Sequence, residues 1–308
     1  MKWINLCFAL LLNAGCAFAN PAETKYTVRV LDAETGLPVT NATVQTTFLQ
    51  KRDPWGTGKG KENRVKKTVD ENGEAVLSGR TIQKGEGATA FAEGYYSDIE
   101  SFRFTGKNLA LNRWEPWNPT IEIKMRPKKN PVPMVYKEIL RQKVPVKQGR
   151  VGFDLEISDW VEPYGNGKSS DFIFTLETVT EPKQGIKYIL SFSNPYDGIQ
   201  EYLPPDNLRS EYIFPYEAPT NGYNISLSKY RFLYYPVIPN EPANNLKEDI
   251  NYIFRVRTKV DEEGNVTSAC YGRIKKEVVF SDTPLMDLQY WFNPDPQSRS
   301  LESLKKPY

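Results

Sequence analysis

Residues 68–77, with the sequence TVDENGEAVL, carry the clearest structural signal in the chain. The pair Asn72-Gly73 tolerates the positive φ angles that a tight hairpin turn requires. The segments on either side, 65–69 and 74–77, contain the apolar and β-branched residues that are typical of short strands. The stretch therefore predicts two strands that are joined directly by a turn.

The same kind of pattern continues outward in both directions. Tyr26, Val28 and Val30 alternate with Thr27 and Arg29, as expected for a strand with one buried face. Further strands bounded by turn residues are predicted at 42–48, 88–92, 99–104 and 120–125. Together these segments predict a seven-stranded-type β-sandwich over residues 22–127.

Five segments carry a family resemblance, and they follow one another at 28–32, 35–39, 42–44, 68–75 and 90–95. In this order they resemble the carboxypeptidase-regulatory-like, transthyretin-like β-sandwich, over about residues 25–125. The resemblance implies an immunoglobulin-like or transthyretin-like fold that serves as an extracellular spacer, a stabilising appendage or a binding module. It implies no catalytic residues. The chain departs from the family pattern at an insertion, 52–64, and at 114–117.

A proline-rich segment, 128–133, follows the sandwich. Its prolines interrupt regular strand pairing and its basic residues favour contact with water, which is typical of a linker. Residues 134–308 again contain stretches in which apolar and polar residues alternate. Two strands within 252–274 are expected to pair across a turn at 261–265. Residues 194–245 are rich in Pro, Tyr and Asn, which predicts long loops. The chain is therefore predicted to be all-β, with a second antiparallel β-rich domain of no recognised family.

Residues 1–19 have the three parts of a secretory signal peptide: a basic start at Lys2, an apolar run, and the small-residue end 17–19. Cleavage after Ala19 predicts an exported protein of the periplasm, the cell surface or the medium. As an alternative, residues 12–16 resemble a bacterial lipobox, whose Cys16 would be acylated and become the mature N-terminus. No later segment is long and apolar enough to predict a transmembrane helix.

The chain of 308 residues contains no histidine. Hydrolases with a His base, His-ligated zinc sites and His pH switches are therefore excluded as mechanisms within the chain. Removal of the signal peptide leaves Cys270 as the one cysteine of the sequence. Its place on an alternating strand favours a small buried residue over a nucleophile. The net charge of +2 argues against a nucleic-acid partner. The one basic stretch, 51–67, is interpreted as a flexible, solvated loop and not as an anion-binding patch.

Three tryptophans are candidate ligand-binding residues, because exposed indole rings on sandwich loops often stack on sugars. Trp55 lies in the Gly-rich loop from Lys51 to Arg64, and this loop is predicted to make any ligand contact of the first domain. The alternative is a solvated insertion whose tryptophan rests on the sheet. Trp114 and Trp117 are the other two candidates, with packing at the domain junction as their alternative role.

Asp261 and Glu263 are the candidate metal ligands, because calcium takes carboxylate and carbonyl oxygens and needs no His or Cys. Their spacing is not that of an EF-hand, so a hairpin turn is favoured over a calcium site and no cofactor is expected. Asp154, Glu156 and Asp171 are interpreted as the polar positions of half-exposed strands.

The recognisable features of the sequence are structural, and none resembles a reaction centre. The favoured function is an exported, non-catalytic binding or adhesion protein of the bacterial cell envelope, with a polysaccharide or another envelope protein as its partner. One alternative is a structural component of the envelope. The other is a His-free, carbohydrate-active enzyme that works with paired carboxylates.

Overall fold

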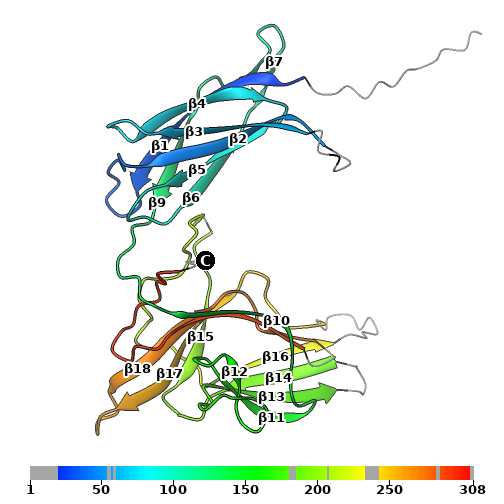
Figure 1. The fold of residues 1–308 in the computed structure, drawn as a ribbon, viewed down its shortest axis with the longest axis vertical. Coiled ribbons are helices and arrows are strands. Elements are labelled where there is room, and N and C mark those ends of the chain that lie inside the picture. The colour runs from blue at the N-terminus through cyan, green and yellow to red at the C-terminus, as the bar shows by residue number, and fades with distance from the viewer. Residues whose placement is uncertain are drawn as a thin grey trace, which may run out of the picture. The chain divides into compact units, whose positions relative to one another are not determined.

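The computed structural model describes residues 20–53, 57, 60–179, 185–206, 208–232, 243–281 and 285–305. All regular secondary structure in these residues is β-strand, which confirms the predicted all-β fold. In the described ranges there is no helix of the length and apolarity that a membrane span needs. The chain divides into two compact units (Figure 1): unit 1 comprises Met1–Glu93 and Ser97–Met125, and unit 2 comprises Gly94–Tyr96 and Arg126–Tyr308.

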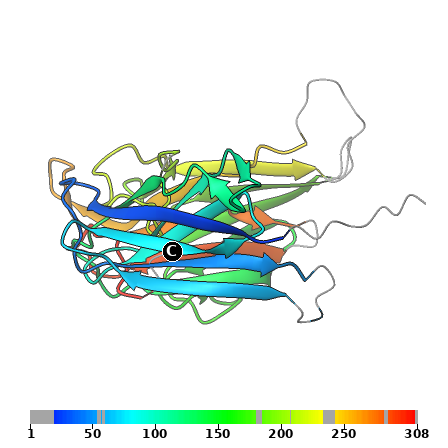
Figure 2. The same ribbon diagram turned by 90° about the horizontal axis from the view of Figure 1, so that it is seen from above.

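Unit 1 is a sandwich of two β-sheets, and its strands run side by side in Figure 2. The first sheet has the order β4 (Glu74–Thr81), β1 (Ala22–Asp32), β8 (Arg113–Glu115) and β7 (Gly106–Asn108), and β9 (Thr120–Met125) also pairs with β1. The second has the order β3 (Lys61–Thr68), β2 (Thr43–Lys51), β5 (Gly85–Phe91) and β6 (Asp98–Arg103). Their inward side chains form the core, where the rings of Tyr26 and Phe48 meet edge to face with centroids 6.3 Å apart.

The turn predicted at Asn72-Gly73 is present, but the strands that it joins do not pair with each other. Asp70 Oδ1 accepts hydrogen bonds from the backbone N–H groups of Asn72 and Glu74, both at 2.9 Å. Gly73 has a φ of 72°, and a Cβ there would lie 2.7 Å from the Val30 carbonyl oxygen. Because β3 pairs with β2 and β4 pairs with β1, the turn connects the two layers of the sandwich.

The interpretation of residues 51–67 as a flexible loop is wrong for Lys51, where β2 ends, and for residues 61–67, which lie in β3. β3 begins at Lys61, and it pairs antiparallel with β2 as an edge strand. All of its side chains are exposed except that of Val65, which is half-buried. Its exposed side chains lack the alternation that reveals a strand in a sequence, and edge lysines hinder pairing with other chains. Residues 54–56, including Trp55, lie outside the described residues.

Unit 2 contains two more sheets. One has the order β10 (Val135–Lys143), β20 (Leu285–Asn293), β18 (Val266–Ile274), β17 (Asn251–Val260) and β15 (Gly198–Tyr202), and β19 (Val279–Phe280) also pairs with β20. The other has the order β12 (Asp159–Trp160), β11 (Gly149–Asp154), β13 (Phe172–Val179), β14 (Gly185–Ser191) and β16 (Ser226–Phe232). The predicted pairing across 261–265 is confirmed, because β17 and β18 are antiparallel neighbours. The main core combines residues of both sheets, as where Phe172 meets Phe254 edge to face at 5.0 Å.

A fully buried carboxylate, that of Glu302, ties separate segments of unit 2 together. Its Oε1 accepts hydrogen bonds from the Tyr96 hydroxyl at 2.8 Å and from the backbone N–H of Lys129 at 3.0 Å. Its Oε2 accepts one from the backbone N–H of Asn130 at 2.7 Å. Part of segment 128–133, predicted as a linker, is therefore hydrogen-bonded to the C-terminal segment.

Candidate functional site

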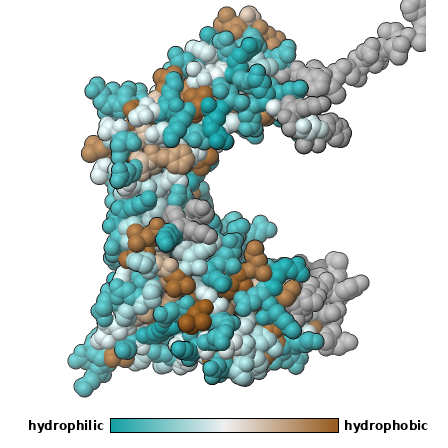
Figure 3. All heavy atoms as spheres, in the orientation of Figure 1, coloured by the Kyte–Doolittle hydropathy of each residue, from teal (hydrophilic) through white to brown (hydrophobic). Residues whose placement is uncertain are grey.

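A groove of about 900 Å³ lies on unit 2. Its walls come from Tyr136 and residues 138–140 of β10, residues 287–289 of β20, residues 275–277 after β18 with Val279 of β19, and residues 244 and 246–248 after β16. Its lining carries charges of both signs: Arg231, Lys247, Lys275 and Lys276 are basic, and Glu138, Glu248, Glu277 and Asp287 are acidic. Figure 3 shows a mainly hydrophilic face on unit 2, with small groups of hydrophobic residues between.

An interruption in the sheet places the charged segment 275–277 beside this groove. β18 stops pairing with β20 at Ile274, and β19 resumes the pairing at Val279. Between them, Lys276 has a φ of 66°, in the left-handed region that reverses the chain locally. After this reversal the side chain of Glu277 is buried and only 7% exposed.

Glu277 is a buried carboxylate with one oxygen in use and one without a partner. Its Oε1 accepts hydrogen bonds from Lys229 Nζ at 2.8 Å, the Tyr252 hydroxyl at 2.9 Å and the backbone N–H of Lys247 at 3.1 Å. Its Oε2 is buried and has no hydrogen-bond partner in the described part of the chain. A buried polar atom without a partner is costly, so an ordered water fits this position.

One wall of the groove offers an aromatic ring beside an amide and a carboxylate. The ring of Tyr136 packs against Trp291 with the centroids 4.9 Å apart. The Tyr136 hydroxyl donates to Glu138 Oε2 at 3.2 Å and accepts from Gln289 Nε2 at 3.1 Å. These contacts hold the three groups in place, and such a set of polar groups around a ring suits a hydroxyl-rich ligand.

Sequence reasoning did not single out Lys229 or Glu277. Lys229 lies on the same face of β16 as Leu227, which packs against the main core, so a lysine at an inward strand position is the available signal. Glu277 gives no such signal. The Glu277 side chain is buried only because the chain reverses at Lys276 and β16 packs close to it.

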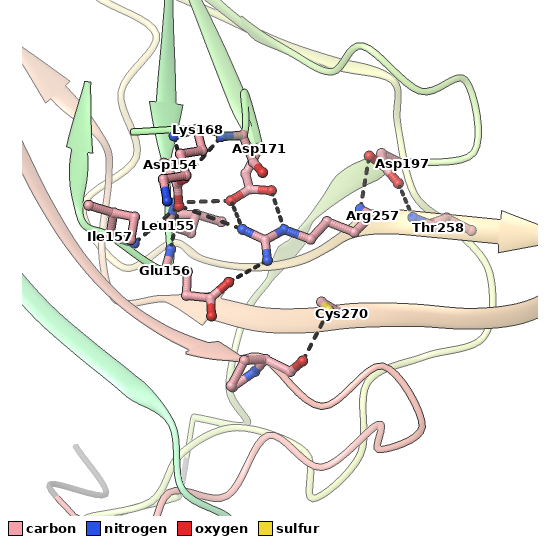
Figure 4. Close-up of polar contacts among 12 residues, drawn as sticks. Asp154, Leu155, Glu156, Ile157, Lys168, Asp171, Asp197, Arg257, Thr258 and Cys270 are labelled. Atoms are coloured by element: carbon pink, nitrogen blue, oxygen red, sulfur yellow. Dashed lines mark hydrogen bonds and ion pairs between the residues drawn. The ribbon is translucent and has the colours of Figure 1, made fainter. Parts of the chain in front are cut away.

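Asp154, Glu156 and Asp171 converge on one arginine, Arg257 (Figure 4). Arg257 Nε and Nη2 donate to the two Asp171 oxygens at 2.8 and 2.9 Å, and Nη1 donates to Glu156 Oε2 at 2.5 Å. Asp154 Oδ1 lies 3.6 Å from Nη2. Asp154 and Asp171 are 2% and 4% exposed, so their interpretation as half-exposed strand positions is wrong. Alternation assigns a strand face, but it does not show that a distant arginine covers that face.

The two buried carboxylates of the Arg257 network have pKa values shifted in opposite directions. Burial raises the pKa of Asp171, and the hydrogen bonds from Arg257 oppose that rise. Burial also acts to raise the pKa of Asp154, but backbone N–H donors outweigh it and hold the pKa below its usual value. These donors belong to Glu156, Ile157, Lys168 and Ser169. The network thus joins the segment between β11 and β13 to β17.

Asp261 and Glu263, the candidate calcium ligands, lie in the turn between β17 and β18. Asp261 Oδ1 accepts hydrogen bonds from the backbone N–H groups of Glu263 at 3.0 Å and Asn265 at 2.7 Å, and Oδ2 accepts one from Asn265 Nδ2 at 3.1 Å. The bonds from Asn265 lower the pKa of Asp261. No cluster of three or more potential metal-binding side chains occurs in the described ranges. The geometry is that of a hairpin turn.

The tryptophan candidates have different surroundings. Trp114 Nε1 donates to a backbone carbonyl of β4 at 3.1 Å, and its ring stacks on Phe104 with the centroids 5.7 Å apart. Trp114 therefore packs within unit 1. Trp117 is 36% exposed, and the guanidinium of Arg113 lies 4.9 Å from its ring centre. Trp55 and its neighbours 54 and 56 are outside the described residues, so the predicted ligand contact there stays a prediction.

Cys270 is 4% exposed, and its thiol lies 3.5 Å from the Pro294 carbonyl oxygen. Burial raises the pKa of the Cys270 thiol to about 11, so very little thiolate forms at neutral pH. The position matches the expectation of a small buried residue on a strand.

Unit 1 has a smaller recess, of about 510 Å³, where β2 and β5 separate. The two strands pair over only three residue positions, and beyond them the Gly87 carbonyl accepts hydrogen bonds from Thr46 Oγ1 at 2.7 Å and the Tyr26 hydroxyl at 3.0 Å. Glu86 lines this recess, is 5% exposed, and has no partner for Oε1 within the described residues. Burial raises the pKa of Glu86 to about 7.

No family model and no curated protein matches the chain. The shaft pilin SpaA of Lactobacillus rhamnosus GG has 11% sequence identity and a TM-score of 0.21, over 59% of this chain and 90% of that chain. BcpA, the major pilin subunit of Bacillus cereus, has 10% identity and a TM-score of 0.20, over 87% of this chain and 95% of that chain. At these TM-scores neither likeness indicates what this chain does.

Proposed function

We propose that this chain is an exported, non-catalytic binding protein of the bacterial cell envelope, and that the groove of unit 2 binds a polysaccharide. The observation that carries the proposal is the groove wall on which the ring of Tyr136 lies beside the carboxylate of Glu138 and the amide of Gln289. The signal-peptide pattern of residues 1–19 supports export.

The composition of the groove favours a hydroxyl-rich ligand over a polyanion. Its four basic and four acidic side chains balance, so they create no strong field of one sign. The ring of Tyr136 and the amide of Gln289 add an apolar face and a hydrogen-bonding group. Carbohydrates present the same combination of apolar ring faces and hydroxyl edges.

The acidic groups of the groove support binding more than catalysis. A glycosidase usually needs two carboxylates that flank the scissile bond and act on it. Here Glu138 accepts a hydrogen bond from Tyr136, Asp287 accepts one from the backbone N–H of Arg141, and Glu277 accepts three. These groups are held as fixed acceptors, which is what a binding groove requires.

A glycan array followed by titration calorimetry tests the proposal. Gln289→Ala removes a donor from the groove wall, and we expect binding of the best glycan to weaken by up to about tenfold, since one hydrogen bond contributes up to about 1.4 kcal/mol. Lys137→Ala is the matched control, because Lys137 belongs to the same wall strand as Tyr136 but does not line the groove. The affinity of Lys137→Ala for the best glycan should match that of the natural chain.

Three outcomes would contradict the proposal. The absence of any bound glycan would favour a structural envelope component. Turnover of a bound glycan would favour the His-free enzyme. Equal affinity of the natural chain and Gln289→Ala would place the binding site elsewhere.

A further inference from the structure

The recess of unit 1 passes through a gap in a β-sheet. β2 and β5 are neighbours in the second sheet (Figure 1), yet they pair over only three residue positions and then separate. The recess of about 510 Å³ lies at this gap, and its lining contains the buried Thr46 and Glu86 as well as residues of the opposite face of the sheet, such as Thr47. It therefore opens on the outer face of the sheet and extends towards the interior of the sandwich. Its volume is typical of a site for a small molecule.

Basic side chains flank the mouth of this recess on both sides. Arg103 of β6 is exposed and belongs to the lining. On the other side, Arg64 of β3 lies directly opposite Thr47 of β2, and Lys66 lies directly opposite Gln45. Side chains alternate between the two faces of a strand, so Arg64 and Lys66 share the outer face with Thr47. All three cations are therefore on the face on which the recess opens.

The positive charge around the recess is not neutralised within unit 1. Among the described residues, none of Arg64, Lys66 and Arg103 forms an ion pair. Glu62 shares the outer face of β3, and it can balance only one of the three cations. Glu86, the acidic residue of the lining, lies on the inward side, where burial raises the pKa of its carboxyl to about 7 and a proton removes part of its charge at neutral pH. The mouth of the recess therefore favours an anion.

The lining between the cations consists mainly of neutral polar groups. Hydroxyl and amide side chains in the lining belong to Thr46, Thr47, Gln83 and Ser101. Gly85 and Gly87 add backbone without side chains, which leaves room for a ligand close to β5. Hydroxyl and amide groups both donate and accept hydrogen bonds, as the hydroxyls of a sugar require. The recess thus combines a surface suited to sugar hydroxyls with cations suited to an acidic group.

We propose that the recess of unit 1 binds an acidic sugar, whose anionic group is held by Arg103 and attracted by Arg64 and Lys66. An arginine guanidinium can donate two parallel hydrogen bonds to a carboxylate or a phosphate. Arg64 and Lys66 contribute an attraction that acts over a longer distance and that salt screens. This site is separate from the groove of unit 2, where acidic and basic side chains balance, and it does not depend on the function proposed for that groove.

Titration calorimetry of the whole chain with glucuronate, glucose and glucosamine tests the proposal, because these sugars share one ring form and differ in charge. We expect glucuronate to bind about tenfold more tightly than glucose or glucosamine, since hydrogen bonds between charged groups are the stronger ones. Arg103→Met should weaken glucuronate binding about tenfold. Lys124→Met is the matched control, because Lys124 is exposed on β9 of the other sheet, and its affinity should match that of the natural chain. Both replaced side chains are exposed, so the melting temperature should stay unchanged.

A second variant tests the cations of β3. Arg64→Met with Lys66→Met should weaken glucuronate binding about threefold and reduce its dependence on salt concentration. The methyl glycoside of glucuronate distinguishes the source of the sugar: equal binding identifies a unit within a polysaccharide, and lost binding identifies a free sugar acid.

Three results would overturn the proposal. The first is equal affinity of the natural chain for glucuronate and glucose. The second is unchanged glucuronate affinity in Arg103→Met, which would place the binding elsewhere. The third is a preference for glucosamine that Glu86→Gln abolishes, which would assign the recess to a cation held by the buried carboxylate.

Discussion

Replacement of Glu86 by glutamine should stabilise unit 1 at neutral and alkaline pH but have little effect near pH 4.5. Burial raises the pKa of the Glu86 carboxyl from 4.5 to about 7 in the folded chain, while a hydrogen bond with Thr81 opposes the rise. The folded chain therefore binds this proton more tightly than the unfolded chain does. The resulting stabilisation is complete below about pH 4.5 and is lost as the pH rises to about 7.

The magnitude follows from the size of the shift. One pKa unit corresponds to about 1.4 kcal/mol, so a rise of about 2.5 units amounts to about 3 kcal/mol between pH 4.5 and pH 7. Hydration of the carboxylate through the recess between β2 and β5 would reduce this value, so we take about 3 kcal/mol as the upper limit. Glu86→Gln has no titrating group at position 86. The variant should therefore not lose this stability between pH 4.5 and pH 7.

Urea denaturation at pH 4.5, 6, 7 and 8 measures the effect, and hydrogen exchange of β5 amides assigns it to unit 1. The difference in the free energy of unfolding between Glu86→Gln and the natural chain should grow in favour of the variant by about 2–3 kcal/mol from pH 4.5 to pH 8. Glu62→Gln is the control, because Glu62 is exposed on the edge strand β3. Its free energy of unfolding should differ from that of the natural chain by the same amount at every pH. A constant difference for Glu86→Gln would refute the reasoning. A difference that favours the natural chain at high pH would indicate a cation bound to Glu86.

Three further predictions concern unit 2. Arg257→Met leaves buried carboxylates unpaired and should lower the free energy of unfolding by about 3–5 kcal/mol in guanidinium denaturation, whereas Glu156→Gln, at a side chain 49% exposed, should cost less than about 1 kcal/mol. An equal cost for the two variants would contradict this account. Glu302→Ala removes the acceptor of three hydrogen bonds and should lower the free energy of unfolding by about 2–4 kcal/mol. It should also speed hydrogen exchange in residues 128–131. Unchanged exchange there would show that Glu302 does not hold this segment in place. Cys270, whose pKa burial raises to about 11, should resist thiol reagents at pH 8 in the native chain and react within minutes in urea, and rapid native labelling would show that the thiol is accessible.

Local patterns in the sequence were enough to predict the fold class and several of its turns. Alternation around Tyr26 and Val28 predicts β1, and the turn at Asn72-Gly73 depends on residues that are adjacent in the chain. The hairpin across 261–265 is a local feature of the same kind. Such elements are predictable because strand period and turn geometry depend on neighbouring residues.

The candidate sites depend on tertiary structure. Glu156 and Arg257 are 101 residues apart in the chain, and Glu277 and Lys229 are 48 apart, so no local pattern links either pair. The strands on either side of the turn at Asn72-Gly73 pair with other strands, because the sandwich must bury both of its sheets. Sequence alternation places a charged residue on a strand face, but only the packing of the other sheet decides whether that face is buried and which opposite charge lies there.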